Sequence, residues 1–133
     1  MNIALVKDLN GEHRAILGTV NRIAAIGALT TETRGLLKET KERIVAHIGK
    51  EEREFYPAMR ALAASSPSID AKLKVMNREM ESIAAAALRF LDEYADGGST
   101  ERFAMDFSNF RHALSERIQR EEFALYSHFL KHA

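Results

Sequence analysis

Four apolar stripes with helical spacing, separated by three short breaks, constrain the fold of this chain more than any other feature. The breaks are Gly27–Thr31, Ser65–Ser68 and Asp96–Thr100, and each contains residues that favour turns or cap a following helix. Between the breaks, apolar residues recur every three or four positions, which keeps one face of a helix against its neighbours. We therefore predict four helices, over residues 2–26, 31–64, 68–95 and 100–131.

Long helices joined by short loops favour one architecture, an all-α antiparallel four-helix bundle with up-down-up-down topology. The chain has 133 residues, the size of one domain, so we predict a single domain over residues 1–133. Pro57 lies inside the second predicted helix. It should kink or end that helix near Phe55–Tyr56, because proline has no amide hydrogen to donate.

Composition excludes several kinds of site and partner. The chain has no cysteine, which excludes disulfides, thiolate metal sites and cysteine nucleophiles. Basic and acidic residues number 19 each, so the net charge favours neither nucleic acid nor a membrane surface as a partner. No apolar run approaches the ~20 residues of a membrane span, and the first residues lack a signal-peptide pattern. We expect a cytoplasmic protein, monomeric or homodimeric.

Polar residues interrupt the apolar stripes at one level of the predicted bundle. His13 lies 14 residues before Gly27 and His47 lies 17 residues after Thr30, so antiparallel helices bring the two histidines to similar heights. Counting from the other breaks places four further residues at this level: Glu51, Met80, Arg117 and Glu121. Buried charges are paired or bind metal, because desolvating a lone charge is costly. The sequence therefore predicts a polar layer in the core, with Met80 facing it.

Two segments of the sequence resemble a known family. The sequence HIGKEEREFYP at 47–57 resembles the His-x-x-x-Glu-Glu signature, followed by an aromatic residue and proline, of the hemerythrin-like (HHE) family. The sequence RIQREEFALY at 117–126 repeats this pattern, and His13 lies where the family places its first-helix histidine. The resemblance covers essentially the whole chain. It implies a hemerythrin-like bundle that holds one or two iron ions and binds or senses oxygen, iron or nitric oxide.

Carried over position by position, the resemblance leaves an incomplete metal site. The third-helix histidine would fall at Met80, a poor ligand for such cations, and the fourth-helix histidine at Arg117, which cannot be a ligand. The candidate ligands that remain are His13, His47, Glu51 and Glu121. They would suffice for one iron or another divalent cation such as zinc.

Two interpretations follow. We favour a metal-free module that regulates or binds an unidentified protein in stress response or signalling. In it, Arg117 takes the place of a lost ion and bridges Glu51 and Glu121, and Tyr56 can donate to the layer. We expect this module to have no cofactor, or one iron or other divalent cation at low occupancy. The alternative is a protein that binds iron or another cation, for sensing or storage. We predict no enzymatic activity, although open metal positions could support redox chemistry.

Overall fold

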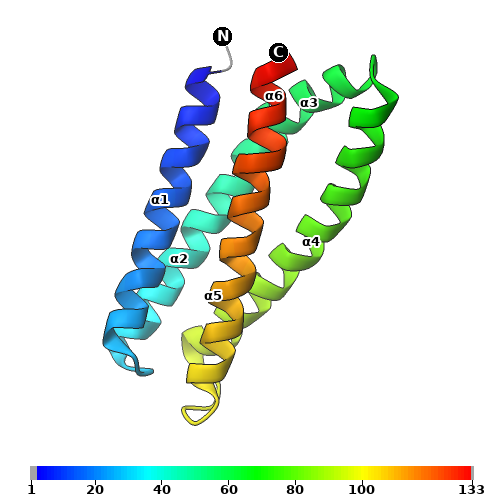
Figure 1. The fold of residues 1–133 in the computed structure, drawn as a ribbon. Coiled ribbons are helices and arrows are strands. Elements are labelled where there is room, and N and C mark those ends of the chain that lie inside the picture. Colours follow the sequence, from blue (N-terminus) through cyan, green and yellow to red (C-terminus); the bar gives the residue numbers. More distant parts are fainter. Residues whose placement is uncertain (1–2, 133) are drawn as a thin grey trace.

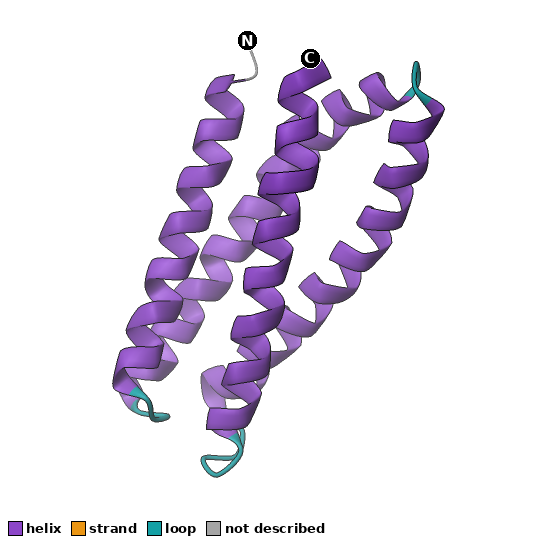
Figure 2. Ribbon diagram, viewed as in Figure 1, coloured by secondary structure: helices purple, strands orange, loops and turns teal. Residues whose placement is uncertain are grey.

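The computed structural model describes residues 3–132, and within them the chain is almost entirely helical and has no strand (Figure 2). Residue 2 of the first predicted helix, and residues 1 and 133 of the predicted domain, lie outside the described residues. The elements are α1 (Ile3–Ile26), α2 (Thr31–Lys50), η1 (Glu51–Phe55), α3 (Tyr56–Ala63), α4 (Pro67–Asp96), α5 (Phe103–Arg120), η2 (Glu121–Tyr126) and α6 (Ser127–His132).

These elements form four antiparallel rods (Figure 1). The first rod is α1, the second is α2 continued by η1 and α3, the third is α4, and the fourth is α5 continued by η2 and α6. The predicted all-α four-helix bundle is therefore confirmed. Both short loops at the lower end in Figure 1 lie opposite the described ends of the chain.

Helix caps form within two of the predicted breaks. The Thr30 hydroxyl accepts a hydrogen bond from the Thr33 amide at 3.1 Å, which fixes the start of α2. The Ser66 hydroxyl accepts one from the Ile69 amide at 3.4 Å, with Pro67 in the first turn of α4, where its missing amide hydrogen costs nothing.

The fourth rod begins later than predicted, at Phe103 instead of residue 100. The residues before it form a turn, in which the Arg102 amide donates to the Ser99 hydroxyl at 3.3 Å. Gly98 in this connection has φ 84°, and a Cβ there would lie 2.4 Å from the Tyr94 ring. The chain therefore needs glycine at this position to turn back against α4.

Both continued rods pass through a π-helical turn. The Tyr56 amide donates to the Glu51 carbonyl, and the Ser127 amide donates to the Glu122 carbonyl, each five residues back. The first π-turn ends at Phe55, two residues before Pro57, where the sequence predicts an interruption. The second has no proline and was not predicted.

The apolar core is divided in two. A lower cluster joins the C-terminal half of α1, α2, the C-terminal half of α4 and α5, and includes Val20, Leu37 and Leu91. An upper cluster joins the start of α1, η1, α3, the first half of α4, η2 and α6, and includes Phe55 and Phe129. Buried polar residues lie between the two clusters, which positions them in the middle of the bundle.

Of the helices that the structure describes, none combines the length and the uninterrupted apolar character that crossing a bilayer requires.

Candidate metal centre

Five buried polar residues meet in the layer between the two core clusters: His13, His47, Glu51, Arg117 and Glu121. We call them the polar layer. His13 comes from the middle of α1, whereas the other four lie where α2 and α5 pass into their π-turns. A π-turn places an extra residue in the helix and changes which side chains face the core below it, and such turns are frequent at functional sites.

Three side-chain atoms of the polar layer converge on one point. His13 Nε2 lies 2.7 Å from Glu121 Oε1 and 3.0 Å from His47 Nε2. His47 Nε2 lies 3.3 Å from the same Glu121 oxygen. All three side chains are buried, and together they form the one set of His, Asp and Glu side chains among the described residues that could hold a metal ion.

The other nitrogen of each imidazole is held by a carboxylate from a different helix. His13 Nδ1 lies 2.7 Å from Glu122 Oε2, and His47 Nδ1 lies 2.7 Å from Glu12 Oε1. A carboxylate can only accept, so each Nδ1 carries the proton and donates it. The Nε2 atoms therefore face the shared point, and the orientation of both rings is fixed, as it is for histidine ligands in metal sites.

Sequence reasoning missed Glu12 and Glu122. Each is the neighbour in sequence of a predicted ligand, His13 and Glu121 respectively, so the pairs Glu-His and Glu-Glu were the available signal. That signal does not identify the histidine that each glutamate contacts, because the histidine belongs to another helix. Lys50 adds to the support of Glu12, with its Nζ 3.6 Å from Glu12 Oε2.

Arg117 lies on the opposite side of Glu121 from the histidines. Its Nε lies 3.4 Å from Glu121 Oε2, and its Nη2 lies 3.6 Å from Glu51 Oε1. Its Nη1 donates to the Met80 backbone carbonyl at 2.9 Å. The structure thus places Arg117 between the two glutamates, with Met80 buried beside it and contacting it through the backbone.

Glu51 stands apart from the three convergent atoms. Its Oε2 accepts a hydrogen bond from the Tyr126 hydroxyl at 2.6 Å. Its Oε1 is buried, accepts no hydrogen bond from the described residues, and lies 3.5 Å from His47 Nε2. Of the four predicted ligands, three therefore converge and the fourth has an unsatisfied oxygen beside them.

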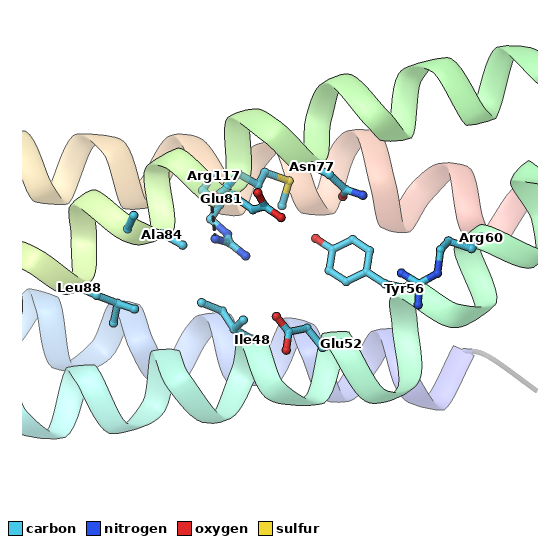
Figure 3. Close-up of a pocket in the computed structure, with 11 residues that line it drawn as sticks. Ile48, Glu52, Tyr56, Arg60, Asn77, Glu81, Ala84, Leu88 and Arg117 are labelled. Atoms are coloured by element: carbon cyan, nitrogen blue, oxygen red, sulfur yellow. Dashed lines mark hydrogen bonds between the residues drawn. The ribbon is translucent and has the colours of Figure 1, made fainter.

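The predicted contribution of Tyr56 to the layer is not seen. Its hydroxyl makes no hydrogen bond with the described residues, and its ring lines a groove between the second rod and α4 (Figure 3). Tyr126, five residues after Glu121 as Tyr56 is after Glu51, is the tyrosine that donates to the layer.

The charges of the layer are strongly coupled. Burial, followed by the charge of Glu121, raises the pKa of Glu51 to about 8. Burial alone would raise the pKa of Glu121, but hydrogen bonds from His13 and His47 and the charge of Arg117 outweigh it and hold that pKa below its usual range.

Burial also competes with hydrogen bonds and nearby charges at the two histidines, but there the pKa values are raised. Burial lowers the pKa of His13, yet its hydrogen bonds to Glu121 and Glu122 and their charges raise it overall. Burial lowers the pKa of His47, and its hydrogen bond to Glu121 and the charge of Glu51 reverse the direction. The site therefore favours positive charge at the point where the two Nε2 atoms meet, whether a proton or a cation supplies it.

Comparison with known proteins gives one match. The family model described as the Hemerythrin HHE cation binding domain matches residues 4–129, almost the whole chain. Neither the curated proteins nor the solved structures include a significant match.

Proposed function

Because this chain belongs to the hemerythrin HHE cation-binding family, we propose that it binds one divalent cation, with iron(II) as the first candidate. The ligands are His13, His47 and Glu121. The observation that carries the proposal is the convergence of their three atoms, with both imidazole Nδ1 atoms already engaged by Glu122 and Glu12.

The size of this triangle suits a single ion. Ligands about 2.1 Å from a metal lie roughly 3.0–3.4 Å apart when they are neighbours in an octahedral or tetrahedral shell. The three separations of 2.7, 3.0 and 3.3 Å between His13, His47 and Glu121 agree with this spacing to a few tenths of an ångström. Two histidines and one carboxylate are a known ligand set for iron(II), and zinc accepts the same donors.

The unsatisfied oxygen of Glu51 supports the same proposal. A buried carboxylate oxygen without a hydrogen bond is costly, and coordination to a cation would satisfy it. Bound iron would supply open positions at which a small molecule could bind. The chain's own residues would orient the ligands through Glu12 and Glu122 and hold a proton on Tyr126, directed at Glu51.

Arg117 limits the site to one ion. Its guanidinium lies against Glu121 Oε2 and near Glu51 Oε1, on the side of these carboxylates where a second ion would need them as ligands. A fixed positive charge there repels a second cation, and arginine offers no lone pair to bind one. We therefore propose a sensor or store of a single cation, in which Arg117 takes the place of a second ion.

A second candidate function is a metal-free module that acts through a protein partner, in regulation, stress response or signalling. One observation favours it: each of the four imidazole nitrogens of His13 and His47 lies within 3.3 Å of a carboxylate oxygen. With the added proton that their raised pKa values favour, every imidazole nitrogen of the layer is satisfied by its own side chains.

Elemental analysis of protein purified without chelator separates the two candidates. We expect about one metal ion per chain in the wild type and in His112→Ala, because His112 is exposed and pairs with Glu116 instead of the layer. His47→Ala should lose the ion. Metal-free wild type whose melting temperature does not change when iron(II) or zinc is added would exclude the first candidate and leave the second.

A further inference from the structure

A groove of about 520 Å³ opens between the second rod and α4, next to the polar layer (Figure 3). This volume is in the range of small-molecule binding sites. One part of its wall is apolar and contains Ile48, Met80, Ala84, Ala85 and Leu88. The small side chains of the two alanines leave the space open, and this wall can bury a short hydrocarbon body.

Arg117, a buried member of the polar layer, also lines the groove. A guanidinium has five N–H donors in a planar fork. In Arg117 the Nε hydrogen and one on Nη1 are used by Glu121 and the Met80 carbonyl, and Nη2 makes only the 3.6 Å ion pair with Glu51. Donors on Nη1 and Nη2 therefore remain, and Figure 3 shows the guanidinium projecting into the groove.

Tyr56 supplies a second donor at the same place. Its hydroxyl points along the groove toward Arg117 in Figure 3, and it makes no hydrogen bond with the described residues. Burial, followed by the charge of Glu51, raises the pKa of Tyr56, so the hydroxyl keeps its proton. The Arg117 guanidinium and the Tyr56 hydroxyl, which both have unused hydrogen-bond donors, thus face one partly enclosed space.

We propose that this groove binds a small monocarboxylate with a short apolar body, whose acid group accepts hydrogen bonds from Arg117 and Tyr56. A planar carboxylate matches the remaining guanidinium donors, and such charge-assisted bonds are stronger than neutral ones. Glu52 and Glu81 also line the groove, but both are exposed, so water and salt screen their charge, and Arg60 opposes it.

The proposed site is distinct from the cation ligands, although it adjoins them. Ile48, Ala84 and Arg117 line both the groove and a cavity of about 20 Å³ beside His13 and His47. None of the three convergent ligands lines the groove. The inference goes beyond cation binding, and it is tested on protein treated with chelator so that its failure leaves the proposed function untouched.

Calorimetric titration of the full, metal-free chain with 4-methylpentanoate tests the proposal. A ligand of this size should bind with a Kd of about 1 mM. Tyr56→Phe removes one hydrogen bond to a charged group and should weaken binding ~10-fold. Ala85→Leu should abolish binding by filling the groove. Its matched control is Ala86→Leu, an exposed neighbour outside the groove, which should bind as the wild type does.

Ligand analogues complete the test. The neutral amide of the same acid should bind more weakly than the carboxylate, because it loses the charge on the acceptor, and 3-methylbutylamine should not bind. Equal binding of acid and amide, tighter binding of the amine, no effect of either Tyr56→Phe or Ala85→Leu, or no binding of the acid at 20 mM ligand, on the order of 20 times the expected Kd, would each overturn the proposal.

Discussion

At the scale of single residues, Glu121 organises the centre. Its Oε1 faces the two imidazole Nε2 atoms, and its Oε2 faces the guanidinium of Arg117. One oxygen of this carboxylate therefore faces the candidate cation site, and the other faces the fixed positive charge of Arg117. This explains how an arginine can stand in a cation-binding fold: it neutralises the oxygen of Glu121 that the histidines do not reach.

Removing Arg117 should be costly in the metal-free protein. Arg117→Ala leaves the buried carboxylates Glu121 and Glu51 without their cationic partner, and we expect the free energy of unfolding to fall by ~3 kcal/mol. Urea denaturation followed by circular dichroism measures this change.

The matched control is Arg120→Ala, one turn away and half-exposed, which pairs with Glu79 and Glu116 at the surface. Its effect should stay below ~1 kcal/mol, because water screens exposed ion pairs. Equal effects of the two substitutions would mean that Arg117 does not neutralise the layer.

At the scale of elements, the two π-turns set the direction of the side chains that close the layer. Glu51 and Glu121 each begin one turn, and Tyr56 and Tyr126 follow them by five residues. Five residues separate hydrogen-bonded partners in π geometry, which brings the Tyr126 hydroxyl within 3.4 Å of Glu121 Oε1. An ordinary α-helix would rotate the tyrosine ~100° further around the axis.

Deleting Phe123 tests the importance of the second π-turn. Phe123 is 79% exposed, so Phe123→Ala removes little buried area and should change stability by less than ~0.5 kcal/mol. Deletion of the residue restores α-helical spacing and rotates Leu125, Tyr126 and Phe129 away from the upper cluster.

We expect this deletion to cost several kcal/mol, on the order of the loss of a large core side chain, and to appear as a lower melting temperature in calorimetry. A melting temperature equal to that of Phe123→Ala would show that the turn tolerates either spacing and does not direct the side chains.

At the scale of the whole molecule, the polar layer separates two apolar cores that differ in how well they are closed. The lower cluster is held by long segments of four helices, and α5 alone contributes five buried apolar residues to it. In the upper cluster, α3 has 8 residues, buries only Met59 and Ala63, and borders the open groove. An isolated helix of this length is unstable, so α3 depends on its packing.

We therefore expect the two halves to open independently in hydrogen exchange. Amides of α3 should exchange at least ~10-fold faster than those in the middle of α5, because α3 can open without unfolding the lower cluster. Exchange measured by mass spectrometry or NMR gives these rates. Equal protection of α3 and α5 would show that the layer joins the cores into one cooperative unit.

Much of this architecture was available from the sequence. The stripes and breaks predict the four rods because apolar spacing and capping are local properties, and helix caps form within two of the three predicted breaks. The layer was predicted because His13, His47 and Arg117 break apolar stripes at matching heights. Family resemblance and the family match agree on the hemerythrin HHE fold.

The tertiary structure decided which atoms meet. Sequence places residues on a helix face, but it leaves open the rotation and height of one helix against another to within an ångström, and hydrogen bonds depend on that last ångström. The crossed support of His13 by Glu122 and of His47 by Glu12 depends on this packing. So does the difference between two tyrosines in equivalent positions: Tyr126 reaches the layer, whereas Tyr56 faces the groove.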